Sequence, residues 1–165
     1  MRTIDNINCL NKSEFLSIFG NVFEKTESVA LKVFELKPFK DFDDIISKML
    51  NIYENYERSK ILDILNSHPE LVIEKKLTTD SKLEQTSANL NECSEEEFEE
   101  FKKLNLEYKT KFGFPFIIAV KGKNKNEILV NFRERIKNDL NKEFFEAKNQ
   151  VKKIASFRLK DILSI

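Results

Sequence analysis

Apolar residues recur at the three- and four-residue spacing of a helix along most of the chain, which predicts an all-α fold of about eight helices. The predicted helices share an apolar stripe and lie at residues 13–23, 28–36, 41–56, 57–68, 94–113, 126–137 and 139–163, with a further one beginning within 77–85. Three glycines and three prolines are few for a β-sandwich or a doubly wound sheet, which need many tight turns. We therefore expect residues 1–165 to form a single all-α domain.

The clearest helix runs from Ser94 to Gly113. Ser94 and Glu97 have the spacing of a capping box, and Cys93 and Phe98 are placed as a hydrophobic staple around it. Gly113 stands where a left-handed residue is favoured at a helix end. This pattern indicates that Cys93 is a packing residue, the alternative being a reactive thiol.

The segment FGFPFIIAVKG at 112–122 breaks the helical pattern. It is almost continuously apolar, contains a proline and is bounded by glycines. These features predict a buried extended element inside the helical fold.

Charge and composition limit the kinds of partner that we expect this protein to bind. Lysine plus arginine and aspartate plus glutamate both number 28, and the two signs alternate along most of the chain. This balance removes the electrostatic reason to expect nucleic acid or an anionic membrane as partner. No apolar run reaches the roughly 18 residues of a membrane-spanning helix, and residues 1–11 do not resemble a signal peptide. Two separated cysteines and one histidine offer little to a zinc site, so we expect reduced thiols in the cytoplasm and no metal.

The single histidine of the chain, His68, has two interpretations. It lies three residues after Leu65 and seven after Ile61, so it continues the apolar face of a helix that Pro69 should end. One interpretation is a packed histidine that caps the carbonyls of its helix. The other is a general acid or base at the mouth of a pocket, because imidazole titrates near neutral pH.

Arg158 lies in the middle of the apolar stripe of the last predicted helix, beside residues such as Val151, Ile154 and Ile162. An isolated buried charge is very costly, so a guanidinium on this face needs a partner. That partner is either an internal carboxylate or a bound anion.

Ser81 and Glu84 lie three residues apart in LTTDSKLEQ, at 77–85. If Ser81 is the N-cap, Glu84 is its reciprocal capping residue and both are structural. If the helix begins at Thr78 instead, Ser81 and Glu84 share one face and Gln85 lies beside them. These local patterns are compatible with a cofactor-free reaction on a small anion, and equally with a helical interaction module.

Seven blocks carry a resemblance to a known family. They are VFE at 22–24, KPF at 37–39, HPEL at 68–71, LTTDSKLEQ at 77–85, LNLEYKTKFGFPFIIAVKG at 104–122, ILVNFRERIKND at 128–139 and EFFEAKNQVKKIASFRLKDIL at 143–163. In this order they resemble the 2-oxo-4-hydroxy-4-carboxy-5-ureidoimidazoline (OHCU) decarboxylases, which form (S)-allantoin in urate degradation. Two positions depart from many members: Thr26, Glu27 and Ser28 replace Ser-Pro-Trp, and Asn89 follows Ala88 where glycine is usual.

The resemblance implies an all-α homodimer that decarboxylates OHCU without metal or organic cofactor. It implies that the catalytic residues are His68 and Glu84. It further implies a set of substrate-binding residues, namely Pro69, Ser81, Gln85, Phe116, Ile117, Ile118, Ala119 and Arg158. The segment 116–119 would act through its backbone. Association with a hydroxyisourate hydrolase is a further expectation. The alternatives are a lyase for a related ureido acid and a non-catalytic helical module that retains the fold.

Overall fold

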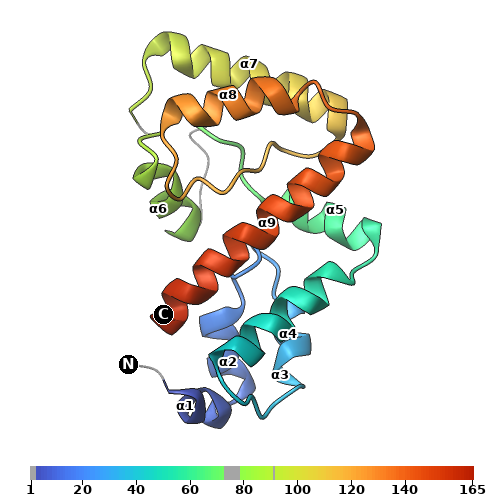
Figure 1. Ribbon diagram of the computed structural model, residues 1–165, viewed down its shortest axis with the longest axis vertical. Coiled ribbons are helices and arrows are strands. Elements are labelled where there is room, and N and C mark those ends of the chain that lie inside the picture. The colour runs from blue at the N-terminus through green and yellow to red at the C-terminus, as the bar shows by residue number, and fades with distance from the viewer. Residues whose placement is uncertain (1–2, 73–78, 91) are drawn as a thin grey trace. The chain divides into compact units, whose positions relative to one another are not determined.

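The computed structural model describes residues 3–72, 79–90 and 92–165, and helices form all of the regular secondary structure in these ranges. These helices, labelled in Figure 1, are α1 (Ile4–Cys9), α2 (Lys12–Phe19), α3 (Ser28–Phe34), α4 (Phe42–Glu54), α5 (Arg58–Ser67), α6 (Thr79–Ser87), α7 (Glu95–Phe112), α8 (Lys125–Arg135) and α9 (Leu140–Leu163). The predicted all-α class is confirmed.

Helix α1 is the element that the apolar pattern did not predict. It has six residues and buries one of them, Ile7, so it carries no apolar stripe. The helix is instead defined by its polar start, where the Thr3 side chain accepts a hydrogen bond from the Asn6 N–H. An N-cap of this kind satisfies a backbone donor that the helix itself leaves unpaired.

The capping box of α7 is confirmed. The Ser94 hydroxyl accepts a hydrogen bond from the Glu97 N–H at 3.2 Å, and the Glu97 carboxylate accepts one from the Ser94 N–H at 2.8 Å. At the other end Gly113 has a φ of 78°, the left-handed conformation expected there. Phe98 is 37% exposed and so lies at the edge of the buried face.

Replacing Ser94 by alanine is expected to lower the free energy of unfolding by about 1 kcal/mol, because the cap of α7 is lost. Urea denaturation followed by circular dichroism measures this loss. Ser47 is exposed within α4 and provides the control. A Ser47→Ala variant should lose no stability, since alanine favours helix interiors more than serine does. Equal losses in the two variants would contradict the capping argument.

Backbone contacts divide the chain into two units. Unit 1 comprises Met1–Ser67 and Lys152–Ile165, and unit 2 comprises His68–Val151. The expectation of one domain over residues 1–165 stays a prediction.

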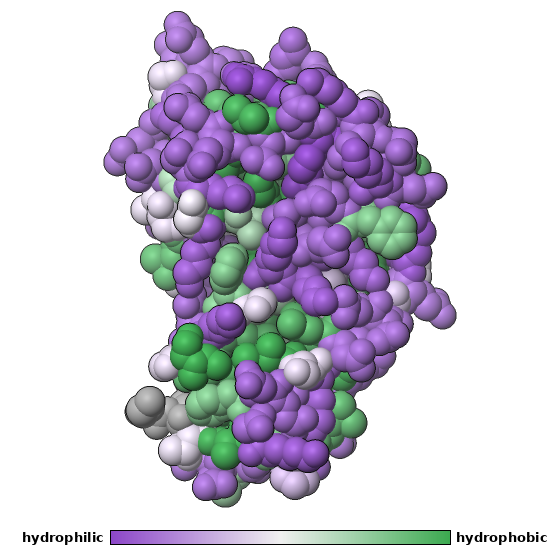
Figure 2. Space-filling view, viewed as in Figure 1, coloured by the Kyte–Doolittle hydropathy of each residue, from purple (hydrophilic) through white to green (hydrophobic). Residues whose placement is uncertain are grey.

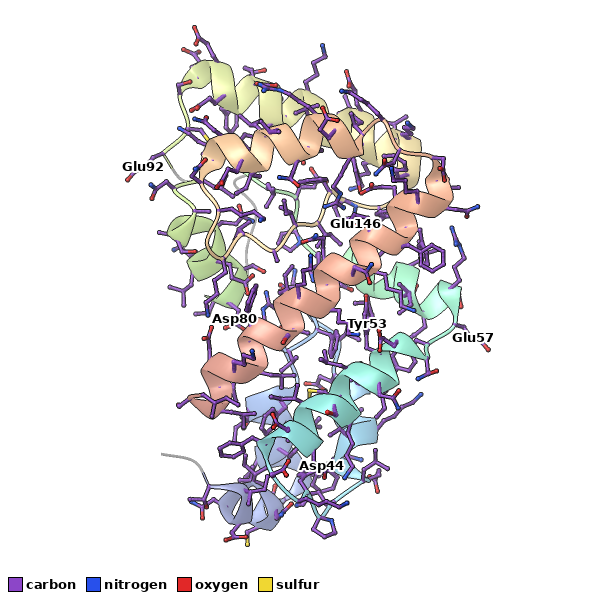
Figure 3. The ribbon with its side chains drawn as sticks, in the orientation of Figure 1. Asp44, Tyr53, Glu57, Asp80, Glu92 and Glu146 are labelled. Atoms are coloured by element: carbon purple, nitrogen blue, oxygen red, sulfur yellow. The ribbon has the colours of Figure 1, made fainter. Side chains whose placement is uncertain are left out.

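Unit 1 has an aromatic core. Helix α3 packs against α2 and α4. The Phe15 ring lies 4.6 Å from that of Phe19 and 6.0 Å from that of Phe39, between ring centroids. The Phe23 ring stacks on that of Tyr53, which Figure 3 labels on α4, at 4.7 Å. Such pairs add to the stabilisation from apolar burial, which the many phenylalanines of this chain supply.

Unit 2 contains the predicted buried segment. Every residue from 114 to 120 is buried, and Figure 1 shows the connection between α7 and α8 running back alongside α8. Phe116 of this segment stacks on Phe132 of α8, with ring centroids 3.8 Å apart and planes 9° apart. Tyr108 of α7 meets the Phe116 ring edge-on at 5.3 Å. Apolar burial and ring stacking thus fix the segment without a β-ladder.

Helix α9 follows its predicted stripe closely. Phe144, Ala147, Val151 and Ile154 are all buried. The prediction was wrong for Leu140, which is 50% exposed because it is the first residue of the helix.

The face of the molecule seen in Figure 2 is largely hydrophilic. Figure 2 shows purple residues over most of the visible face, with apolar residues in separate patches. Within the described ranges, no helix combines the length and the apolar character needed to span a membrane.

Candidate active site

His68 directly follows α5 and is 8% exposed, at the start of a turn that continues through Val72. The helix ends at Ser67, as expected from the effect of Pro69 on the preceding residue. Val72 has a φ of 58°, which is unusual for a β-branched side chain and costs about 1–2 kcal/mol. Other contacts must therefore hold this turn in place.

Side chains from two helices hold the turn after His68. The Val72 N–H donates to Gln85 Oε1 at 3.2 Å, and Gln85 Nε2 donates to the Glu70 carbonyl at 3.4 Å. Asn105, buried on α7, donates through Nδ2 to the Leu71 carbonyl at 2.9 Å. Gln85, predicted to bind substrate, is thus also bonded to the turn that carries His68.

Ser81 and Glu84 lie inside α6, which begins at Thr79 in the described residues. Ser81 is therefore no N-cap, and the two side chains share a face one turn apart. Ser81 is 4% exposed and Glu84 is half-buried. The predicted start of this helix at Thr78 lies outside the described residues.

Asn89 explains one departure from the family pattern. Its φ of 55° is left-handed, and its N–H and that of Leu90 donate to the carbonyls of Thr86 and Gln85. This is a Schellman motif, in which glycine is favoured and asparagine is the usual substitute. Because Asn89 is exposed, it closes α6 without filling space beside Glu84.

Arg158 is buried in unit 1, as the stripe of α9 predicted, and an internal carboxylate is its partner. Its Nη1 lies 3.0 Å from Glu24 Oε2 and donates to the Asn21 carbonyl at 3.1 Å. Glu24 is fully buried. The glutamate belongs to the VFE block, yet sequence reasoning did not pair it with Arg158. The feature that could have indicated a buried glutamate is its position directly after the apolar, buried residues Val22 and Phe23.

The segment 116–119 lies in unit 2, and side chains of other helices form hydrogen bonds with its backbone. The Ile117 carbonyl accepts a hydrogen bond from Arg135 Nη1 at 2.7 Å. The Ala119 N–H donates to Gln150 Oε1 at 2.9 Å. Arg135, the last residue of α8, and Gln150 of α9 therefore contact the segment predicted to bind substrate.

A buried ionic cluster around Arg135 was missed by sequence reasoning. Arg135 Nη2 lies 2.5 Å from Glu143 Oε1, and the Tyr108 hydroxyl donates to the same carboxylate. Asn138 Nδ2 donates to Glu143 Oε2 at 2.7 Å. Burial raises the pKa of Tyr108, so the phenol remains a neutral donor. The available signal was that Glu143 lies four residues before the buried Ala147, on the same face of α9.

Cys93 is half-buried, and its Sγ donates to the Leu90 carbonyl at 3.4 Å. Burial raises the pKa of this thiol, which lowers its reactivity and supports its interpretation as a packing residue. In the described ranges, no group of three or more His, Cys, Asp or Glu side chains is arranged to hold a metal ion.

Unit 2 thus contains the turn that begins at the buried His68 and the helix α6, which carries Glu84. Unit 1 contains the buried guanidinium of Arg158. The fold is that of a solved (S)-allantoin synthase, with a TM-score of 0.80 and 25% identity over 98% of this chain and 54% of that chain. It is also that of an OHCU decarboxylase crystallised with (S)-allantoin, with a TM-score of 0.76. The class is therefore an all-α protein of the (S)-allantoin synthase fold.

Residues 8–160 match the family model of OHCU decarboxylase, and the chain belongs to this family. It is 34% identical to an OHCU decarboxylase of Halalkalicoccus jeotgali over 97% of this chain and 91% of that protein. It is 38% identical to a uric acid degradation bifunctional protein of a Bacillus species over 98% of this chain. The chain spans 32% of that protein and 33% of its Bacillus subtilis counterpart.

Proposed function

We propose that this chain catalyses the cofactor-free decarboxylation of OHCU to (S)-allantoin, as a carboxy-lyase of urate degradation. The observation that carries the proposal is the family match across residues 8–160, with relatives named as OHCU decarboxylases over almost their whole length. The presence of His68, Glu84 and Arg158, each buried or half-buried, supports a catalytic rather than a scaffolding role.

The reaction needs no electron-accepting cofactor. Breaking the bond to the carboxylate releases CO2 and leaves an electron pair on the hydroxylated ring carbon. The neighbouring imine accepts that pair as its nitrogen gains a proton, which gives an enol. The enol becomes a carbonyl as its hydroxyl proton leaves and the ureido-bearing carbon gains a proton. The protein has to orient the carboxylate, bind the hydroxyl and deliver the proton to one face.

We assign the roles as follows. His68 contacts the hydroxyl or carboxylate end of the substrate and transfers a proton. Glu84 accepts hydrogen bonds from the ureido or ring N–H groups. Arg158 binds an anionic or carbonyl oxygen, since a guanidinium presents several donors to such a group.

The remaining binding residues supply shape and backbone contacts. Pro69, half-buried, and Ser81, buried, line the site near His68 and Glu84 in this proposal. Gln85 contacts substrate while it holds the turn at Val72. The backbone of 116–119 binds the amide edges of the ring.

We further propose a cytoplasmic homodimer that associates with a hydroxyisourate hydrolase. Release of an unstable substrate close to this site would limit its spontaneous decay, which is the advantage of such an association. The Bacillus relatives are named as bifunctional proteins of uric acid degradation, so two functions of that degradation are joined in those proteins.

The test is to generate the substrate in place from urate with the upstream enzymes, and to follow the circular dichroism of (S)-allantoin with and without this protein. We expect the protein to accelerate the appearance of the (S) signal well above spontaneous decay. No acceleration by a correctly folded protein would reject the decarboxylase and favour the non-catalytic helical module. Consumption of a related ureido acid in preference to OHCU would favour the other lyase.

A further inference from the structure

The buried segment between α7 and α8 is held at two backbone positions by side chains of other helices. Arg135 donates to the Ile117 carbonyl at 2.7 Å, and Gln150 accepts from the Ala119 N–H at 2.9 Å. In an extended chain, a residue directs its N–H and C=O to one edge and the next residue directs its own to the other edge. Ile117 and Ala119 therefore bond along one edge, and the N–H and C=O of Ile118 face the opposite edge.

The arginine at this edge is itself fixed from several sides. Its Nε and Nη2 donate to Glu143 Oε1 at 2.9 and 2.5 Å, and Asn138 holds the other oxygen of that carboxylate. The guanidinium lies 4.5 Å from the centre of the Phe116 ring. A buried charge with this many partners has little freedom to move, so the Ile117 carbonyl is held in one place.

The glutamine at this edge is oriented in the same manner. Gln150 is 7% exposed, and its Nε2 donates to Glu146 Oε1 at 2.7 Å, one turn earlier on α9. Figure 3 labels Glu146 on this helix. Because the amide nitrogen is engaged by Glu146, the oxygen is directed at the Ala119 N–H.

We propose that Gln150 and Arg135 are positioning residues, which set the register of the segment 116–119 so that the backbone of Ile118 meets the substrate ring. This inference rests on the proposed function, because it assumes that the segment binds OHCU. Neither side chain touches substrate in this proposal. Their effect passes through the backbone that they hold.

The first test compares Gln150→Met with the wild type in the coupled (S)-allantoin assay. Methionine has a similar volume and no oxygen for the Ala119 N–H. A displacement of a binding group by about 1 Å can cost up to about 100-fold, so we expect kcat/KM to fall by about 10–100-fold. The change should appear mainly as a higher KM, since the contacts concern ring binding rather than proton transfer.

Two further variants separate positioning from general stability. In the double variant Glu146→Gln/Gln150→Glu the carboxylate and the amide exchange places. The new carboxylate at position 150 can again accept a hydrogen bond from the Ala119 N–H, and the new amide at position 146 can donate one to that carboxylate. We expect this double variant to recover most of the KM. Asn149→Leu changes an exposed amide at the position just before Gln150 and should leave KM unchanged.

The outcomes are distinct. An inactive wild type would reject the proposed function, whereas an active wild type with unchanged KM in Gln150→Met would reject only the positioning role. A lower melting temperature with unchanged KM would also reject it, because it would indicate a purely structural contact. If Gln150→Met does not fold, Arg135→Lys keeps the charge opposite Glu143 but loses the guanidinium fork. It must raise KM for the inference to stand.

Discussion

Replacing His68 by asparagine is expected to lower kcat for (S)-allantoin formation by about 10²–10⁴-fold, the usual contribution of a general acid or base. Asparagine retains a polar group on the turn after α5 but cannot take up or release a proton near neutral pH. The coupled circular dichroism assay measures the loss, with the far-ultraviolet spectrum as evidence that the helices remain. An unaltered KM would place the loss in the chemical step.

Asn66 provides the matched control for this experiment. It is exposed and lies two residues earlier on α5, where its Nδ2 donates a hydrogen bond to the Leu62 carbonyl of the same helix. Asn66→Ala should keep full activity. A His68→Asn variant with full stereospecific decarboxylation would remove the histidine from the mechanism and return it to the packed, helix-capping interpretation.

Replacing Glu143 by glutamine is expected to lower the free energy of unfolding by about 3–5 kcal/mol. The substitution keeps the size of the side chain and removes its charge, so it leaves the buried guanidinium of Arg135 without its counter-ion. Glu143 is fully buried and Arg135 is 7% exposed, so water cannot compensate. Urea denaturation of the two proteins gives the difference directly.

The control is an arginine–glutamate pair on the surface. Arg133 donates to Glu100 through Nε at 2.7 Å and Nη2 at 2.8 Å, and the two side chains are 51% and 35% exposed. Glu100→Gln should change stability very little, because solvent screens exposed pairs. Equal losses in the free energy of unfolding for Glu143→Gln and Glu100→Gln would contradict the prediction, because burial would then not determine how much these ion pairs stabilise the fold.

Local patterns accounted for most of the helices and for many of the buried side chains. The stripe of α9 located Arg158 in the core, and Pro69 ended α5 before His68. Capping boxes are short-range, so Ser94 and Glu97 could be paired from sequence alone. Helix α1 was missed because it buries too little apolar surface to produce a period.

Partners that are distant in sequence could not be derived in the same way. Nothing local pairs Glu24 with Arg158, or Asn105 with the Leu71 carbonyl, because these contacts exist only after the helices have packed. Tertiary hydrogen bonds to backbone, such as that from Arg135 to Ile117, leave no trace in side-chain periodicity. The family resemblance predicted a set of site residues but did not name the side chains that hold them.

The Glu24–Arg158 pair has a consequence for how this protein can diverge. Both side chains are buried and each neutralises the charge of the other. Replacing one of them by an uncharged residue therefore leaves the other as a buried charge without its counter-ion. Descendants that lose one partner would need a compensatory exchange at the other almost at once. We therefore expect the two positions to change jointly over evolution, although they lie far apart in the sequence.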